Sequence, residues 1–230
     1  MDNYLAMQNL NRRTMKYIST NITIGMSLLD IRKLCEQYML DNGADSFWYY
    51  AVGAFVFSGD ETTVSISGKH YDTSNRLVQK NDIVTIDLSP QKDNVWGDYS
   101  RTIIIEDGYV VDNVENIKNK EWKSGVFMEQ FLHDKLIEIA LPNMTFEDLY
   151  FIMNTIIKDE GFINLDFLGN LGHSIVKDKD KRVFIEEGNK IKLCEVEMFT
   201  FEPHISIEGS KFGYKMEDIY YFKNDKLTKL

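Results

Sequence analysis

Four segments of the chain place apolar residues three and four positions apart, which is the spacing of one buried face on an α-helix. This spacing predicts helices from Leu5 to Ile18 and from Trp122 to Ile139. Two more helices are predicted from apolar faces formed by Leu28, Ile31, Leu34, Cys35, Tyr38 and Met39, and by Phe146, Leu149, Tyr150, Met153, Ile156 and Ile157. The predicted helices therefore come in two pairs, one in each half of the chain.

The second helix of each pair starts and ends with the same sequence pattern. Residues 26–30 (Met-Ser-Leu-Leu-Asp) recur as residues 144–148 (Met-Thr-Phe-Glu-Asp), an offset of 118, and Gly43 recurs as Gly161 at the same offset. A Ser or Thr with an acid three residues later caps a helix N-terminus, and a glycine commonly ends a helix. The shared offset indicates two structurally similar halves.

A first hairpin is predicted by two short runs of alternating apolar or β-branched residues, 83–89 and 96–103. With the turn centred on residues 92–93, Asp87 lies opposite Asp98. Like charges on neighbouring strands destabilise a sheet, and half-buried carboxylates are costly unless a cation lies between them. A divalent metal ion is the simplest such cation. The alternative for this pair alone is two solvated carboxylates on an exposed face.

A second hairpin is predicted from residues 195–203 and 214–222, where Glu202 can oppose Glu217 as the two aspartates do. The order helix, helix, strand, strand thus occurs twice. We therefore predict an α+β fold with two pseudo-symmetric halves, a curved antiparallel sheet and helices on its outer side.

The composition indicates one well-filled domain covering residues 1–230, because 43% of the residues are hydrophobic and no linker is evident. A net charge of −10 argues against nucleic-acid or anionic-membrane partners. The apolar runs are too short to span a bilayer, the N-terminus lacks a signal-peptide pattern, and two cysteines cannot form a disulfide framework. We expect a cytoplasmic protein.

One histidine lies between the two hairpins in a context that suits a metal ligand. His173 follows Gly172 and precedes an apolar run. Together with the four hairpin carboxylates it forms a set suited to two divalent ions, because four negative charges balance two dications.

At these residues the chain resembles the methionine aminopeptidase, aminopeptidase P, prolidase and creatinase family, whose fold is called pita-bread. The motifs that carry the resemblance are Asp-x-Ser-Arg-Thr, Gly-His, Thr-Phe-Glu-Pro and Met-Glu-Asp. The resemblance runs from about Tyr4 to Phe222 and implies a catalytic domain alone, closest in motifs to the Xaa-Pro peptidases. The family's metal ligands, in order, correspond to Asp87, Asp98, His173, Glu202 and Glu217.

The resemblance also implies a chemistry. Two metal ions lower the pKa of water and promote amide hydrolysis, with manganese, cobalt, iron or zinc as candidates. Glu202 is implied to be the catalytic proton shuttle as well as a ligand. His70, which is followed by Tyr71, stands where the family has a substrate-contacting histidine, so we assign it a catalytic and substrate-binding role.

Three positions depart from the family pattern. Asp180 stands where the family usually has a second active-site histidine, within the charged run 177–182, which we interpret as a solvated loop. His204 replaces a glycine after Glu-Pro, and Lys215 replaces an arginine common in proline-directed members. We assign both of these residues to substrate binding, although lysine does not reproduce the bidentate contacts of arginine.

Three functions are consistent with these residues. The first is a metal-dependent exopeptidase acting on short Xaa-Pro peptides, favoured by the motifs around Asp98, His70 and Glu217. The second is a methionine aminopeptidase, favoured by chain length. The third is a catalytically weak relative that binds peptides, suggested by Asp180. The sequence does not decide the metal or the oligomeric state, for which a homodimer is the candidate.

Overall fold

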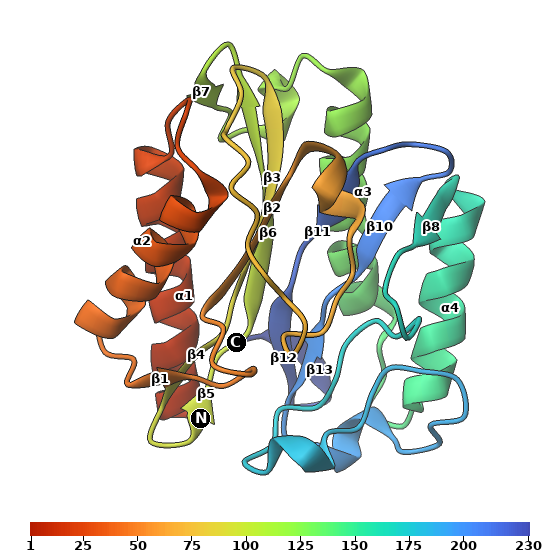
Figure 1. Ribbon diagram of the computed structural model, residues 1–230. Helices are drawn as coiled ribbons and strands as arrows, with labels where there is room; N and C mark the ends of the chain where they lie inside the picture. Colours follow the sequence, from red (N-terminus) through yellow and green to blue (C-terminus); the bar gives the residue numbers. More distant parts are fainter.

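The computed structural model describes all residues 1–230 and contains the four predicted helices (Figure 1). Their bounds are α1 Asp2–Asn21, α2 Leu28–Asp41, α3 Lys120–Ile139 and α4 Phe146–Asp159. The predicted caps are present as well. The Ser27 hydroxyl accepts a hydrogen bond from the Asp30 N–H, and Thr145 and Asp148 form a complete capping box. The predictions of helix position and helix start are therefore confirmed.

Thirteen short strands form four antiparallel sheets between the two helix pairs. The largest sheet has the order β2-β3-β6-β7, and the others have the orders β1-β4-β5, β11-β10-β8 and β13-β12-β9. The bounds are β1 Ser46–Phe47, β2 Ala54–Ser58, β3 Asp82–Leu88, β4 Pro90–Lys92, β5 Val95–Trp96, β6 Tyr99–Glu106, β7 Tyr109–Val110, β8 Phe162–Asn164, β9 Phe199–Phe201, β10 His204–Ile207, β11 Gly213–Lys215, β12 Asp218–Lys223 and β13 Lys226–Lys229. Four 3₁₀ turns complete the chain at η1 Gly59–Thr63, η2 Val114–Asn116, η3 Lys179–Lys181 and η4 Leu193–Glu195.

The first hairpin forms, but its register differs from the prediction by two residues. Asp87 lies opposite Ser100, and Lys92 pairs with Val95. The physical reason is the turn: Asp93 and Asn94 both adopt positive φ (50° and 62°), which produces a two-residue turn one position later than predicted. The direct opposition of Asp87 and Asp98 is therefore wrong. A shift by two keeps the side of each side chain, so both carboxylates still face one way.

The second hairpin keeps the predicted register. Phe201 pairs with Asp218 and His204 pairs with Lys215, so Glu202 and Glu217 fall opposite each other in the gap between the paired segments. Its first strand is shorter than predicted, because β9 begins only at Phe199.

The two halves meet where β6 of the first half touches the second hairpin. The Glu217 N–H donates to the Ser100 carbonyl at 3.0 Å, and the Thr102 hydroxyl donates to the Lys215 carbonyl at 3.1 Å. Figure 1 shows α1 and α2 on one side of the strands and α3 and α4 on the other. Each half has its own hydrophobic cluster. This junction brings residues from distant parts of the chain together.

None of the helices has the length and apolar character needed to cross a membrane.

Candidate metal centre and substrate pocket

Three buried side chains at the junction lie close enough to share one metal ion. Asp98 precedes β6, Glu217 precedes β12, and His173 lies in the loop between β8 and η3. Each offers a donor atom, and the three donor atoms lie within 4.8 Å of one another. His173 Nε2 is 3.4 Å from Asp98 Oδ2. A carboxylate-rich set with one imidazole is a donor set that divalent transition metals accept.

The backbone around His173 fixes its ring with Nε2 toward the carboxylates. Gly172 has a φ of +142°, and a Cβ there would lie 2.3 Å from the Thr200 carbonyl oxygen, so only glycine fits. The Thr200 N–H donates to the His173 carbonyl at 2.7 Å. The ring Nδ1 lies 3.2 Å from the Ser174 carbonyl, which can only accept, so Nδ1 carries the hydrogen. The Nε2 lone pair is then available to a cation.

Glu217 gives the strongest indication that a cation belongs here. Its side chain is fully buried, and neither carboxylate oxygen has a hydrogen-bond partner. Its backbone is held by Arg101, whose guanidinium donates to the Glu217 carbonyl at 2.7 Å and to both oxygens of Asp218. A buried carboxylate without partners is costly, and a divalent ion removes that cost. The residues present therefore fit a metal ion.

The acid groups of the centre are electrostatically crowded. Burial raises the pKa of Asp98, Glu202 and Glu217, and neighbouring carboxylates raise all three pKa values further, whereas Lys215 opposes the rise. Burial also lowers the pKa of His173 to about 4, which keeps the imidazole neutral at pH 7. Metal binding requires a neutral imidazole, and a bound cation would relieve the repulsion among the crowded carboxylates.

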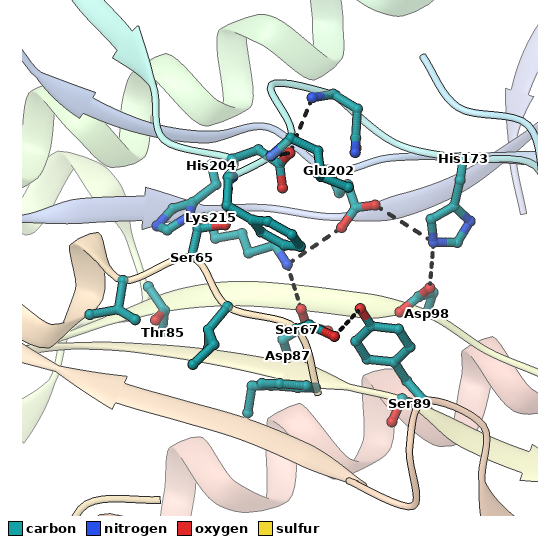
Figure 2. A pocket seen from close by; sticks show the side chains of 18 of the residues that line it. Ser65, Ser67, Thr85, Asp87, Ser89, Asp98, His173, Glu202, His204 and Lys215 are labelled. Carbon is teal, nitrogen blue, oxygen red and sulfur yellow. Dashed lines mark hydrogen bonds and ion pairs between the residues drawn. The ribbon is translucent and has the colours of Figure 1, made fainter. Parts of the chain in front are cut away.

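Lys215 lies inside this centre, between the other two predicted ligands (Figure 2). Its Nζ is 2.5 Å from Asp87 Oδ2 and 3.4 Å from Glu202 Oε2. The other Glu202 oxygen is 3.6 Å from His173 Nε2. Burial alone would lower the pKa of Lys215, but Asp87, Glu202 and Glu217 raise it well above its usual value. The five predicted ligands are thus brought together with one fixed ammonium among them.

The remaining predicted residues differ in their placement. His204 lines the pocket beside Lys215, and its Nε2 donates to the Thr62 carbonyl at 2.7 Å while burial lowers its pKa to about 4. His70 is exposed and does not line the pocket, so the structure does not bring it to the site as we expected. The turn closed by the His70 N–H and the Ser67 carbonyl carries it outward, and Ser67 lines the pocket instead.

The pocket next to the metal centre is about 360 Å³, a size that suits a short peptide. Much of its wall is aromatic, and the rings come from Trp48, Tyr49, Tyr50, Phe55, Phe57, Phe167 and Phe184. Asp180 is exposed in η3 and lies outside this wall, whereas Arg182 lines it.

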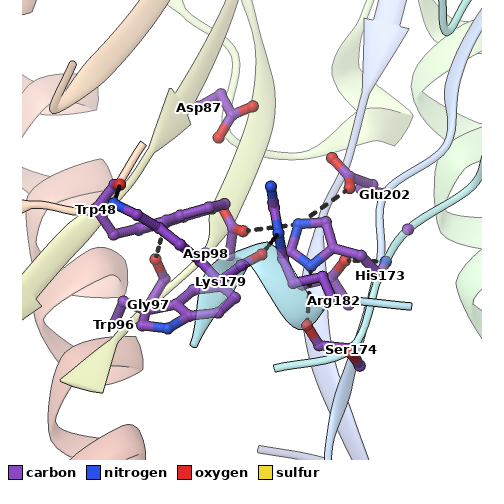
Figure 3. A network of polar contacts seen from close by, with 12 residues as sticks. Trp48, Asp87, Trp96, Gly97, Asp98, His173, Ser174, Lys179, Arg182 and Glu202 are labelled. Carbon is purple, nitrogen blue, oxygen red and sulfur yellow. Dashed lines mark hydrogen bonds and ion pairs between the residues drawn. The ribbon is translucent and has the colours of Figure 1, made fainter. Parts of the chain in front are cut away.

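Sequence reasoning missed Arg182, because it ends a charged run that we interpreted as solvent-facing. Figure 3 shows it beside His173 and Trp48. A signal for this pocket was present in the sequence. The consecutive aromatic residues 47–50 are unusual for a surface loop, and the last three of them supply part of the wall.

The fold and the buried donor set define a metal-dependent enzyme class, and comparison with known proteins identifies the family. The model of metallopeptidase family M24 matches residues 2–224, so the chain belongs to that family. The pita-bread fold and the family predicted from the four motifs are therefore confirmed.

Individual relatives agree with this assignment. An Xaa-Pro dipeptidase of Pyrococcus furiosus is 27% identical over 197 residues, which cover 86% of this chain and 51% of the relative. The structure of an X-Pro aminopeptidase from Thermotoga maritima has a TM-score of 0.79 at 23% identity, covering 98% of this chain and 58% of that one. A methionine aminopeptidase structure from Thermotoga maritima has a TM-score of 0.76 at 14% identity, covering 97% of this chain and 93% of that one. The chain thus spans about half the length of the Xaa-Pro relative.

Proposed function

We propose that the protein is a dinuclear metal-dependent exopeptidase that hydrolyses the N-terminal peptide bond of short peptides of the Xaa-Pro type. The observation that carries the proposal is the buried Glu217 carboxylate, which has no protein partner and lies with Asp98 and His173 around one point. The names of the Xaa-Pro relatives support the choice of substrate.

Asp98, His173 and Glu217 hold the first ion in this proposal, and Asp87 and Glu202 complete the set. Bound divalent ions supply Lewis acidity and lower the pKa of water, so that a nucleophile is present at neutral pH. Manganese, iron, cobalt and zinc all accept such ligands.

Glu202 is the proposed proton shuttle. Its side chain is one-fifth exposed, as is that of Asp87, and it lines the pocket beside the metal centre. Burial raises its pKa, which brings its carboxylate closer to the value that proton transfer at neutral pH requires. Its proposed role is to take the proton of the attacking water and pass it to the leaving amine.

The test is hydrolysis of Ala-Pro and of Met-Ala-Ser by protein loaded with each of the four metals. We expect cleavage of Ala-Pro, and cleavage of Met-Ala-Ser alone would favour a methionine aminopeptidase. Glu202→Gln should lower kcat about 10²- to 10⁴-fold, because an amide oxygen can still contact an ion but the amide cannot accept a proton. Retention of most wild-type turnover in Glu202→Gln at saturating metal would reject the shuttle assignment.

A further inference from the structure

Arg182 presents a positive charge to the substrate pocket on an aromatic support. Its guanidinium carbon lies 4.8 Å from the ring centre of Trp48, 5.5 Å from that of Phe184 and 5.7 Å from that of Tyr49. All four side chains line the pocket. Cation–π contacts at these distances hold a guanidinium in place without neutralising its charge.

Trp48, one of the three rings around Arg182, also contacts the metal centre. The Trp48 indole N–H donates to the Gly97 carbonyl at 3.1 Å, directly before Asp98, and its ring meets the His173 ring edge-on at 5.7 Å. Lys179 Nζ donates to the Trp48 carbonyl at 2.6 Å, which fastens the loop that carries Arg182 (Figure 3). The position of the guanidinium relative to the metal ligands is therefore fixed.

The two terminal Nη groups of the Arg182 guanidinium are free to bind a ligand. Its Nε donates to the Lys179 carbonyl at 2.8 Å, whereas neither terminal Nη group has a hydrogen-bond partner and no carboxylate forms a salt bridge with it. The other cation of the pocket, Lys215, is already engaged by Asp87 and Glu202. Two free, coplanar N–H donors on a fixed guanidinium match the two oxygens of a carboxylate.

We propose that Arg182 binds a carboxylate of the peptide substrate through its two Nη groups and so determines which peptides are cleaved. The carboxylate comes either from the C-terminus of a dipeptide or from an acidic side chain. This inference rests on the proposed peptidase function and specifies its substrate class as anionic peptides. Asp180, exposed on η3, takes no part in this contact.

The experiment compares Ala-Pro, Ala-Pro-amide and Glu-Pro-amide as substrates of the metal-loaded protein and of Arg182→Gln. Loss of a charged, bidentate contact should raise KM for the carboxylate-bearing substrate by roughly 10- to 100-fold. KM for Ala-Pro-amide should change less than about twofold, which also shows that the variant is folded. An effect on Ala-Pro identifies a C-terminal carboxylate, and an effect on Glu-Pro-amide identifies a side chain.

Two further variants separate the contact from general electrostatics. Lys181→Gln removes the same charge from an exposed neighbour that pairs with Asp178, and it should leave all three KM values unchanged. Arg182→Lys keeps the charge but loses the planar fork, so it should recover only part of the affinity. An equal rise in KM for all three substrates in Arg182→Gln would overturn the proposal.

The proposal and the peptidase function can fail separately. If none of the peptides is hydrolysed, the peptidase function is wrong, and calorimetric titration with Ala-Pro, Glu-Pro-amide and Ala-Pro-amide still tests Arg182. Tighter binding of Ala-Pro or of Glu-Pro-amide than of Ala-Pro-amide, abolished in Arg182→Gln, supports the carboxylate site. Equal binding of all three compounds to the wild-type protein overturns it.

Discussion

Lys215 places an ammonium group where two of the proposed metal ligands would meet a second ion. Its Nζ contacts Asp87 and Glu202, and neither of these carboxylates belongs to the tight group of Asp98, His173 and Glu217. An ammonium repels a dication that binds the same carboxylates, and the repulsion is stronger away from bulk water. In the proposed two-metal centre, the first ion therefore has a prepared site, whereas a second ion would have to displace Lys215 from its two carboxylates.

We predict that Lys215→Met strengthens binding of the second ion. The methionine keeps most of the side-chain volume but removes the competing charge, so the second dissociation constant for Mn²⁺ should fall at least about tenfold. Isothermal titration with metal analysis measures both constants. Lys211→Met, at an exposed lysine beside Phe212, is the matched control and should leave both unchanged. An unchanged second constant in Lys215→Met would show that Lys215 does not compete.

Residue order and local motifs were sufficient to group the five proposed ligands, because each follows or precedes a recognisable strand or glycine. The placement of His70 outside the pocket and of Arg182 inside it did not follow from the sequence, since both residues lie in loops. The direction of a loop side chain depends on turns such as the one at residues 67–70 and on distant rings such as Trp48, which no local pattern encodes.

At the scale of elements, α3 packs closely on β11 because a glycine of α3, which has no side chain, faces the ring of Tyr214. Gly125 lies in the second turn of α3, and a Cβ there would come within about 2.2 to 2.3 Å of three ring atoms of the buried Tyr214. Glycine in a helix interior normally costs about 1 kcal/mol relative to alanine. Here the close approach of the Tyr214 ring decides whether alanine stabilises or destabilises the protein.

We predict that Gly125→Ala destabilises the protein by about 1 to 3 kcal/mol, because overpacking outweighs the gain in helix propensity. Urea unfolding followed by circular dichroism measures the change. Ser124→Ala, at the exposed neighbouring position, should be neutral or slightly stabilising. A Gly125→Ala variant as stable as the wild type would mean that Tyr214 moves without cost.

The helices were predictable because their apolar spacing and caps are local properties, and both capped helices begin where the repeated pattern indicates. The register of the first hairpin was not, because a shift of the turn by one residue preserves the alternation of apolar side chains. Only the positive φ of Asp93 and Asn94 selects between the two registers.

At the scale of the whole molecule, a buried histidine links α3 to the C-terminal sheet and makes stability depend on pH. His133 Nδ1 lies 2.7 Å from the Tyr220 hydroxyl, and Nε2 lies 3.1 Å from the Met216 carbonyl. The carbonyl only accepts, so Nε2 carries the hydrogen and Nδ1 accepts from tyrosine. Burial lowers the pKa of His133 from 6.5 to about 3.

We predict that this contribution to stability is complete above pH 6.5 and is lost progressively as the pH falls toward 3, because only the unfolded histidine binds a proton in that range. The slope amounts to about 1.4 kcal/mol per pH unit at most. His133→Gln should be less stable at pH 7.5 but should lose less stability between pH 7 and pH 5. Urea unfolding of both proteins in chelator measures the two slopes, and identical slopes would contradict the assignment.

The two halves join at β6 and the second hairpin and through contacts such as that of Lys179 with Trp48, and the proposed ligands come from both halves. The repeated helix pattern predicted two halves, but the bridge between Ser100 and Glu217 depends on how the halves dock. That docking is a property of the whole chain, so it could not follow from local sequence.

The metal centre is the central claim, and anomalous diffraction from crystals grown with Mn²⁺ tests it most directly. We predict one strong peak among Asp98, His173 and Glu217, and a second, weaker peak about 3 to 4 Å away toward Asp87 and Glu202. The Asp98→Ala protein should lose the strong peak. A folded protein with manganese bound only elsewhere, and none at these residues, would contradict the account.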